Sequence, residues 1–248
     1  MKPKKIHDLV WLIGSGTDES VLTDPHDCHT YLVWDGTHGF LIDCGTGLGF
    51  ERWSNALQQI CESAALAGCL VTHYHADHAG GAAQVSQFGI PVFGSEITAN
   101  ALQRGDEQST QLSVARTAGI YPSGYALRPA SLTTITGGQV LRSGGIAIEI
   151  VDAPGHCDGH LVFIVQVSGS RLLFSGDCLF AGGRVSIQAI PDCRLVAYGE
   201  TVADLAEREI DVMLPGHGEL VLSGAGEQIH QAASSFARLI PPQNFLTS

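Results

Sequence analysis

The sequence has few basic residues for its length. Its 248 residues include 13 Lys and Arg against 25 Asp and Glu, which gives a formal net charge of −12. Such an acidic chain repels a phosphate backbone, so we expect no nucleic acid among its partners.

The amino-terminal part of the sequence lacks a long apolar run. Met1–Lys5 is basic, but the apolar residues that follow, Leu9–Ile13, are too few for a signal-peptide core or a membrane span. We therefore expect no membrane partner and a cytoplasmic location.

Linker-like stretches, low-complexity segments and internal repeats are absent as well. With 44% hydrophobic residues, the chain has ample material for one large core. We predict a single domain over residues 1–248, and we leave open whether it forms a homo-oligomer.

A disulfide framework is not expected either. The sequence holds seven cysteines, an odd number that is scattered along the chain, which fits reduced thiols. Cys44, Cys157 and Cys178 each directly follow an acidic residue or a histidine. They are either small residues packed in a tight site or groups with a ligand or redox role.

Histidines and aspartates are concentrated in four segments of the sequence. The first is the run Thr72–His78, which contains His73, His75, Asp77 and His78, and the others surround His156, Asp177 and His217. A glycine precedes each of the last three, so the backbone can bend there and bring their side chains together. Imidazole and carboxylate groups in this number suit two divalent ions with open positions for water and substrate.

The spacing within the first run supports this interpretation. His73 and His75 alternate along an extended segment and therefore point the same way. The apolar residues Gly68–Thr72 predict a buried strand before them, and Ala79–Gln87 predicts the start of a helix after them. Such side chains lie at the carboxyl end of a strand, where loops present groups to a ligand. Taken singly, each residue could instead be a surface or structural group.

The sequence Thr72–Gly81 resembles the signature of the metallo-β-lactamase superfamily, and the later histidines and aspartate match its remaining ligand positions in order. Asp43 matches an early aspartate of the family that supports the metals. The resemblance implies an α/β fold, a four-layer αββα sandwich of two mixed sheets flanked by helices.

The resemblance also implies a role for each residue. His73, His75 and His156 would hold one ion, Asp77, His78 and His217 the other, and Asp177 would bridge them; Asp77 and Asp177 are also the expected catalytic groups, and Asp43 and His160 would support the ligands. His160 is expected to orient a ligand or line the pocket without binding metal.

Two such ions, roughly 3.5 to 4 Å apart, would share a water and aim it as hydroxide at an electrophilic carbon. The expected cofactors are two divalent ions, zinc by preference, with iron or manganese as alternatives. The expected reaction is hydrolysis of a small-molecule substrate, namely a small ester, thioester or lactone. Two alternatives stay open: a mononuclear iron enzyme similar to persulfide dioxygenases, and a non-hydrolytic metal-bearing sensor or interaction protein.

Two features of the sequence indicate which branch of the superfamily it resembles. An aspartate at the bridging position, Asp177, is similar to glyoxalase II-type thioesterases and lactonases and argues against a true β-lactamase. The sequence ends at Ser248, soon after the last expected helix. We therefore expect it to lack the additional helical region that supplies part of the glutathione site in glyoxalase II.

Apolar patterns predict the order of the main elements. Expected strands are Val10–Ile13, Thr30–Trp34, Phe40–Asp43, Ile146–Val151, Leu161–Val167, Arg171–Phe174 and Asp211–Leu214, and expected helices are Phe50–Ala67, Leu195–Glu207 and Glu227–Leu239.

Residues 94–129 form a long stretch between the first motif and the next pair of strands. Its centre, Asp106–Ala118, is expected to be helical, and Tyr121–Tyr125 is rich in turn residues and carries two aromatic rings. The segment either covers the metal site as an insertion or is a solvated helix without ligand contact. Arg104, Arg116 and Arg128 could bind an acidic substrate or simply keep the surface soluble.

Overall fold

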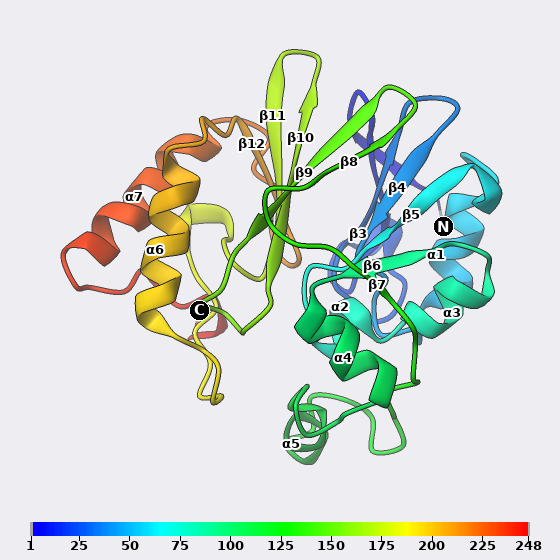
Figure 1. The fold of residues 1–248 in the computed structure, drawn as a ribbon, viewed down its shortest axis with the longest axis horizontal. Helices are drawn as coiled ribbons and strands as arrows, with labels where there is room; N and C mark the ends of the chain where they lie inside the picture. The colour runs from blue at the N-terminus through cyan, green and yellow to red at the C-terminus, as the bar shows by residue number, and fades with distance from the viewer. Residues whose placement is uncertain (1, 248) are drawn as a thin grey trace. The chain divides into compact units, whose positions relative to one another are not determined.

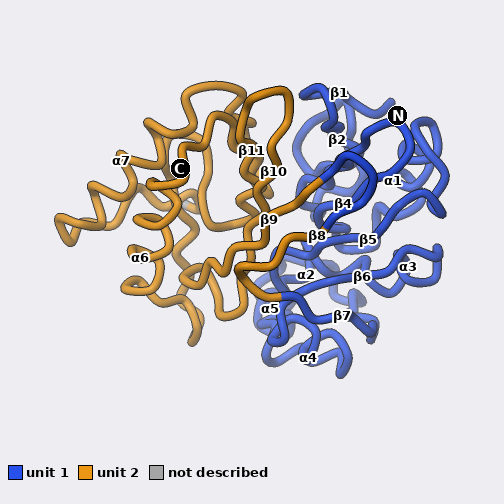
Figure 2. Tube along the Cα trace, turned by 45° about the horizontal axis from the view of Figure 1, so that its top comes forward, with its two compact units in different colours: residues 1–135, 142–146 blue, residues 136–141, 147–248 orange. Residues whose placement is uncertain are grey.

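The computed structural model describes residues 2–247, so Met1 and Ser248, the ends of the predicted domain, lie outside the described residues. The chain divides into two compact units (Figure 2). Unit 1 comprises residues 1–135 and 142–146, and unit 2 comprises residues 136–141 and 147–248. Whether the chain is one domain in the functional sense stays a prediction.

Unit 1 contains a mixed seven-stranded sheet whose strands follow sequence order. The strands are β1 (Lys4–His7), β2 (Val10–Gly14), β3 (Thr30–Trp34), β4 (Gly39–Ile42), β5 (Leu66–Leu70), β6 (Val92–Gly94) and β7 (Thr133–Thr134). Pairs from β1 to β4 are antiparallel, and pairs from β4 to β7 are parallel. Parallel pairing places the ends of β4 and β5 at one edge of the sheet, where the first histidine run begins.

The helices of unit 1 are short. They are α1 (Phe50–Leu57), α2 (Ala76–Ala79), α3 (Ala82–Gln87), α4 (Glu96–Arg104) and α5 (Leu112–Thr117). α1 buries Trp53 and Leu57 in a core that also contains Leu41 and Val71 of the sheet region. Burial of these apolar side chains stabilises the sheet that carries the histidine run.

Unit 2 contains most of a second mixed sheet, of order β12-β11-β10-β9-β8. The strands are β8 (Val140–Ser143), β9 (Ile146–Asp152), β10 (Leu161–Val167), β11 (Ser170–Gly176) and β12 (Val212–Pro215). β9, β10 and β11 are antiparallel, whereas β12 runs parallel to β11. Helices α6 (Leu195–Ala206) and α7 (Ala225–Ala237) pack together (Figure 1) and bury Tyr198, Val202 and Ile229 in one core.

These sheets and helices confirm the predicted α/β class with two mixed sheets. The strands Thr30–Trp34 and Leu161–Val167 have the predicted bounds, and the other predicted strands are present with ends shifted by one or two residues. Four short strands, β1, β6, β7 and β8, were not predicted.

The predicted helix Phe50–Ala67 was wrong in its second half. α1 ends at Leu57, a 3-10 turn covers Ser63–Ala65, and β5 begins at Leu66. β5 pairs with β4 from Leu66 onward, so the last two residues of the expected helix are extended. Tertiary pairing therefore overrides local helix propensity here.

Two further helices are shorter than predicted. The helix expected over Ala79–Gln87 begins only at Ala82, as α3, because α2 ends at Ala79 and Gly80 and Gly81 separate the two helices. A Cβ at Gly81 would lie 2.2 Å from the carbonyl oxygen of Cys44, so the backbone approach requires glycine. In the region 106–118 only α5 is helical, because a turn precedes it and Gln111 has a φ of +56°.

Within the described residues, no helix is both long enough and apolar enough to cross a membrane.

Candidate metal centre

The first histidine run lies between the end of β5 and the start of α2, both in unit 1. His73 and His75, two residues apart, face each other with Nε2 of His73 3.0 Å from Nδ1 of His75. Both side chains are buried. Two imidazole nitrogens brought together out of water are suited to share a cation.

His78 is fully buried and is oriented by Asp43. Its Nδ1 lies 2.8 Å from Oδ2 of Asp43, so this nitrogen donates to the carboxylate and Nε2 is left as the lone-pair donor. Oδ2 of Asp77 lies 3.7 Å from that Nε2. His78 and Asp77 therefore present one nitrogen and one oxygen toward the same point.

Asp43 directly follows β4 and is itself held in place. Its Oδ1 accepts the backbone N–H of Thr72 at 2.7 Å, and its Oδ2 accepts the Thr72 hydroxyl at 2.9 Å. Its φ is +58°, an uncommon backbone conformation that aspartate tolerates better than most residues. The predicted supporting aspartate thus connects the ends of β4 and β5 to His78.

Tyr121 was not predicted as a site residue. Its hydroxyl donates to Oδ1 of Asp77 at 3.0 Å, although 44 positions separate the two residues. Burial, together with the charge of Asp77, raises the pKa of Tyr121 far above its usual range, so the phenol stays protonated and acts as the donor. The only signal in the sequence was the pair of aromatic residues in the turn-rich segment.

Cysteines in this region are neutral thiols. Burial raises the pKa of Cys28, which lies with Asp43 and His78 in a cluster of polar atoms within 4.8 Å of one another. A hydrogen bond with Cys69, followed by burial, raises the pKa of Cys44. Because the thiolate is the reactive form, these shifts favour the interpretation of packed, inert residues.

In unit 2, Asp177 follows β11 and has a histidine beside each of its two oxygens. Nε2 of His156 lies 3.7 Å from Oδ2, and Nε2 of His217 lies 3.6 Å from Oδ1. Two donors about 2.1 Å from one tetrahedral ion lie about 3.4 Å apart, so each of these spacings fits a pair of ligands around a metal ion. The donor set of unit 2 therefore fits divalent metal ions.

The backbone of unit 2 orients His156. Its Nδ1 donates to the carbonyl oxygen of Ser186 at 3.0 Å, which leaves Nε2 facing Asp177. Gly155 has a φ of +146°, and a Cβ there would lie 2.5 Å from the Cα of Tyr198. Glycine is required at this position because α6 passes so close.

Tyr198 was also missed by the sequence analysis, since its place in an amphipathic helix is typical of a core residue. Its buried hydroxyl accepts the N–H of Ser186 at 3.0 Å and lies 2.7 Å from the carbonyl oxygen of Cys178. It thus ties together the backbone segments beside His156 and Asp177.

His160 contacts Asp177 through the main chain. The backbone N–H of Asp177 donates to Nε2 of His160 at 3.2 Å. Nε2 of His160 is therefore the acceptor in a contact with the backbone of Asp177, and the supporting role expected of His160 stays a prediction. Burial raises the pKa of Cys178, the next residue, so this thiol is also neutral.

The three arginines of residues 94–129 make local contacts. Arg116 binds Glu107 with two hydrogen bonds of 2.6 and 3.1 Å and donates to the carbonyl oxygen of Tyr125 at 2.6 Å. Arg104 lies 3.6 Å from Asp106, and Arg128 donates to Gln87 at 3.3 Å. Arg116 therefore braces the segment.

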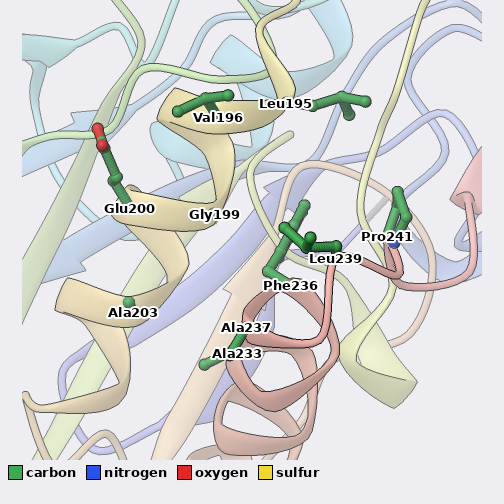
Figure 3. Close-up of a pocket in the computed structure, with 10 residues that line it drawn as sticks. All are labelled: Leu195, Val196, Gly199, Glu200, Ala203, Ala233, Phe236, Ala237, Leu239 and Pro241. Atoms are coloured by element: carbon green, nitrogen blue, oxygen red, sulfur yellow. The ribbon is translucent and has the colours of Figure 1, made fainter.

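An apolar groove of about 450 Å³ lies between α6 and α7 in unit 2 (Figure 3). Glu200 is the one charged residue among those that line it, and none of the predicted metal ligands does so. Its composition lacks the donors that a metal site or a hydrolytic centre requires.

The sequence profile of the metallo-beta-lactamase superfamily matches residues 23–217, which include all the predicted ligands. The chain belongs to this superfamily. A metallo-beta-lactamase of Cronobacter sakazakii superposes on it with a TM-score of 0.72 at 18% identity, covering 96% of this chain and 97% of the other. This likeness confirms the predicted superfamily fold.

Curated relatives within the superfamily are similar over part of their length. A hydroxyacylglutathione hydrolase of Albidiferax ferrireducens is 29% identical over 183 residues, which are 73% of this chain and 59% of the relative. An atrochrysone carboxyl ACP thioesterase of Emericella nidulans is 26% identical over 223 residues, 89% of this chain and 57% of the relative. The chain thus spans less than two thirds of the length of either relative.

Proposed function

We propose that this chain is a dinuclear metal-dependent hydrolase of a small ester, thioester or lactone. The observation that carries the proposal is the arrangement around Asp177, whose two oxygens lie beside the Nε2 atoms of His156 and His217. A carboxylate with a separate histidine at each oxygen is suited to bridge two ions. Such a bridge would hold two ions close enough to act together on one substrate.

Seven residues would hold the ions. His73, His75 and His156 would bind one, Asp77, His78 and His217 the other, and Asp177 both. Bound divalent ions lower the pKa of water toward neutrality and polarise a carbonyl group. We propose zinc because nitrogen and oxygen donors of this kind, with positions left for water and substrate, are typical of catalytic zinc.

The contribution of the protein is orientation. His78 and His156 each donate from Nδ1, to Asp43 and to the Ser186 carbonyl respectively, which leaves Nε2 of each residue as the atom that would bind an ion. This mechanism needs no serine or cysteine nucleophile, and the raised pKa of Cys28 agrees with an inert thiol there.

The names of the relatives support hydrolysis as the reaction. One is a hydrolase of a hydroxyacylglutathione and the other a thioesterase, which makes a thioester the first substrate to test. The likeness to the Cronobacter sakazakii enzyme concerns the fold alone, and a β-lactam is therefore the less favoured substrate.

Location and partners stay predictions. A cytoplasmic location is supported by cysteines that form no disulfide in the described part of the chain. The net charge of −12 supports the expectation that nucleic acid is not a partner. Measurement of the molecular mass in solution would test whether the protein forms a homo-oligomer.

The test combines metal analysis with a substrate panel. We expect purified protein to carry about two zinc ions per chain and to hydrolyse a thioester or lactone faster than a β-lactam, with Asp177→Ala as the inactive control. One iron per chain with oxygen consumption on a persulfide would replace this proposal by the dioxygenase. Two bound metals without turnover on any substrate would favour a sensor or interaction protein.

A further inference from the structure

The two oxygens of Asp77 have different surroundings. Oδ2 lies 3.7 Å from Nε2 of His78, on the side where the proposed ion would bind. Oδ1 accepts the hydroxyl of Tyr121 at 3.0 Å. Oδ1 thus binds another side chain of the protein, whereas Oδ2 faces the position proposed for the metal ion.

The position of Asp77 leaves room for a hydrogen bond to decide which of its oxygens faces a metal ion. It lies in the first turn of α2, a helix of only four residues, and its side chain is 19% exposed. The terminal torsion of an aspartate is broad, so either oxygen can turn toward a ligand unless a hydrogen bond selects one. Tyr121 supplies that bond.

The Tyr121 ring is itself fixed by aromatic neighbours. It stacks on Tyr125 with ring centroids 5.4 Å apart and an interplanar angle of 25°, and the ring of His26 lies 6.1 Å from it. The Tyr125 hydroxyl donates to the carbonyl oxygen of Thr46 at 2.8 Å. This second bond anchors the pair of rings to the loop that follows β4.

The segment that carries both rings is braced from its other side. Arg116 joins Glu107 to the carbonyl oxygen of Tyr125. Glu107 also accepts the backbone N–H of Leu127 at 3.3 Å. The Tyr121 hydroxyl is therefore delivered to Asp77 by a fixed loop, which is the condition for a support that positions a ligand.

We propose that Tyr121 is a positioning residue that selects which oxygen of Asp77 binds the second metal ion, so that residues 94–129 complete the metal centre. This inference rests on the proposed function, because it takes Asp77 as a ligand. It assigns to the segment a contribution to metal affinity as well as any part it has in shaping the substrate pocket.

Zinc binding to metal-free protein, measured by competition with a chelator of known affinity, tests the proposal without any substrate. Tyr121→Phe should weaken the binding of one of two zinc ions by about 10- to 100-fold, the usual effect of removing an outer support, and leave the other unchanged. Arg128→Ala is the control, since it alters an exposed side chain of the same segment that donates to Gln87 and should leave both affinities within about threefold of the wild type.

Equal zinc affinities in Tyr121→Phe and the wild type, with the fold verified by circular dichroism, would overturn the proposal. So would a raised KM with unchanged zinc affinity, since Tyr121 would then contact substrate and leave Asp77 unaffected. A wild type that binds two zinc ions and hydrolyses nothing would end the hydrolase proposal while leaving this one intact. A wild type that binds a single ion would overturn both.

Discussion

The two units hold their metal-ligand candidates in different ways. In unit 1 the supports are side chains, since Asp43 binds His78 and Tyr121 binds Asp77. Each of these bonds joins residues at least 35 positions apart. The supports of unit 1 therefore depend on particular side chains that substitution can remove one at a time.

In unit 2 the supports involve the main chain. His156 donates to the carbonyl oxygen of Ser186, and the backbone N–H of Asp177 donates to His160. Tyr198 acts on these same backbone segments and not on a ligand side chain. We therefore expect substitution of a supporting residue in unit 1 to lower metal affinity strongly. Substitution of a supporting residue in unit 2 should mainly lower the free energy of unfolding.

We expect the largest effect from substitution of a proposed metal ligand, because the comparison between the units concerns only the residues that support the ligands. Asp177→Ala removes the carboxylate beside His156 and His217, so turnover should fall on the order of 10³-fold, as several kcal/mol of lost transition-state stabilisation implies. Metal content measured on the same sample should fall as well. Retention of two metals with near-normal turnover would show that Asp177 does not bridge.

The next largest effect should come from Asp43→Ala. The substitution removes the partner of His78 and leaves the N–H and hydroxyl of Thr72 buried without their acceptor. We expect zinc affinity about 10- to 100-fold lower and a free energy of unfolding lower by about 1–3 kcal/mol. Chelator competition and urea unfolding measure the two effects.

Asp43→Asn is the control for that change, because asparagine keeps one acceptor oxygen and tolerates the positive φ. Asp43→Asn should lower zinc affinity and the free energy of unfolding by less than Asp43→Ala does. Equal losses in the two variants would mean that the carboxylate charge, and not its hydrogen bonds, supports His78.

Tyr198→Phe tests the other side of the comparison. The change leaves the backbone N–H of Ser186 without its acceptor, so we expect a loss of about 1–3 kcal/mol in the free energy of unfolding. Zinc affinity should stay within about threefold of the wild type, because the backbone bonds of His156 and Asp177 remain. A large fall in zinc affinity at unchanged stability would remove the distinction between the units.

The smallest effect concerns the pair that braces the Tyr121 segment. A hydrogen bond from Arg116 holds the pKa of Glu107 below its ordinary value of 4.5. The stability that this shift contributes is present above pH 4.5 and is lost as the pH falls through the lowered pKa of the folded state. In metal-free protein, Glu107→Gln should therefore reduce the slope of unfolding free energy against pH below 4.5, and identical slopes would contradict this.

The sequence was most informative where one physical signal dominated. Dense apolar runs located strands such as Leu161–Val167, and the alternation of His73 and His75 predicted their common direction, which their 3.0 Å approach bears out. The extended conformation of Leu66 and Ala67, where a helix was expected, could not be predicted because it depends on pairing with β4, which is distant in sequence.

The supporting residues show the same limit. Tyr121 and Asp77 are 44 positions apart and come into contact only in the folded chain, so no local sequence pattern predicts that contact. Tyr198 has the periodicity of a core residue, and its second role depends on a hydroxyl that meets backbone groups of other segments. Ligands are recognisable because their residue types are chemically specific, whereas their supports are ordinary residues given a role by packing.

The apolar groove between α6 and α7 affects how stability can be measured. Val196 is 78% exposed and Leu239 is 92% exposed, so the folded protein has an apolar surface that is exposed to solvent. A fluorescent dye that reports unfolding by binding such surface should already be bright at room temperature and show a shallow melting signal. Circular dichroism or the intrinsic fluorescence of the buried Trp53 would follow unfolding without this background.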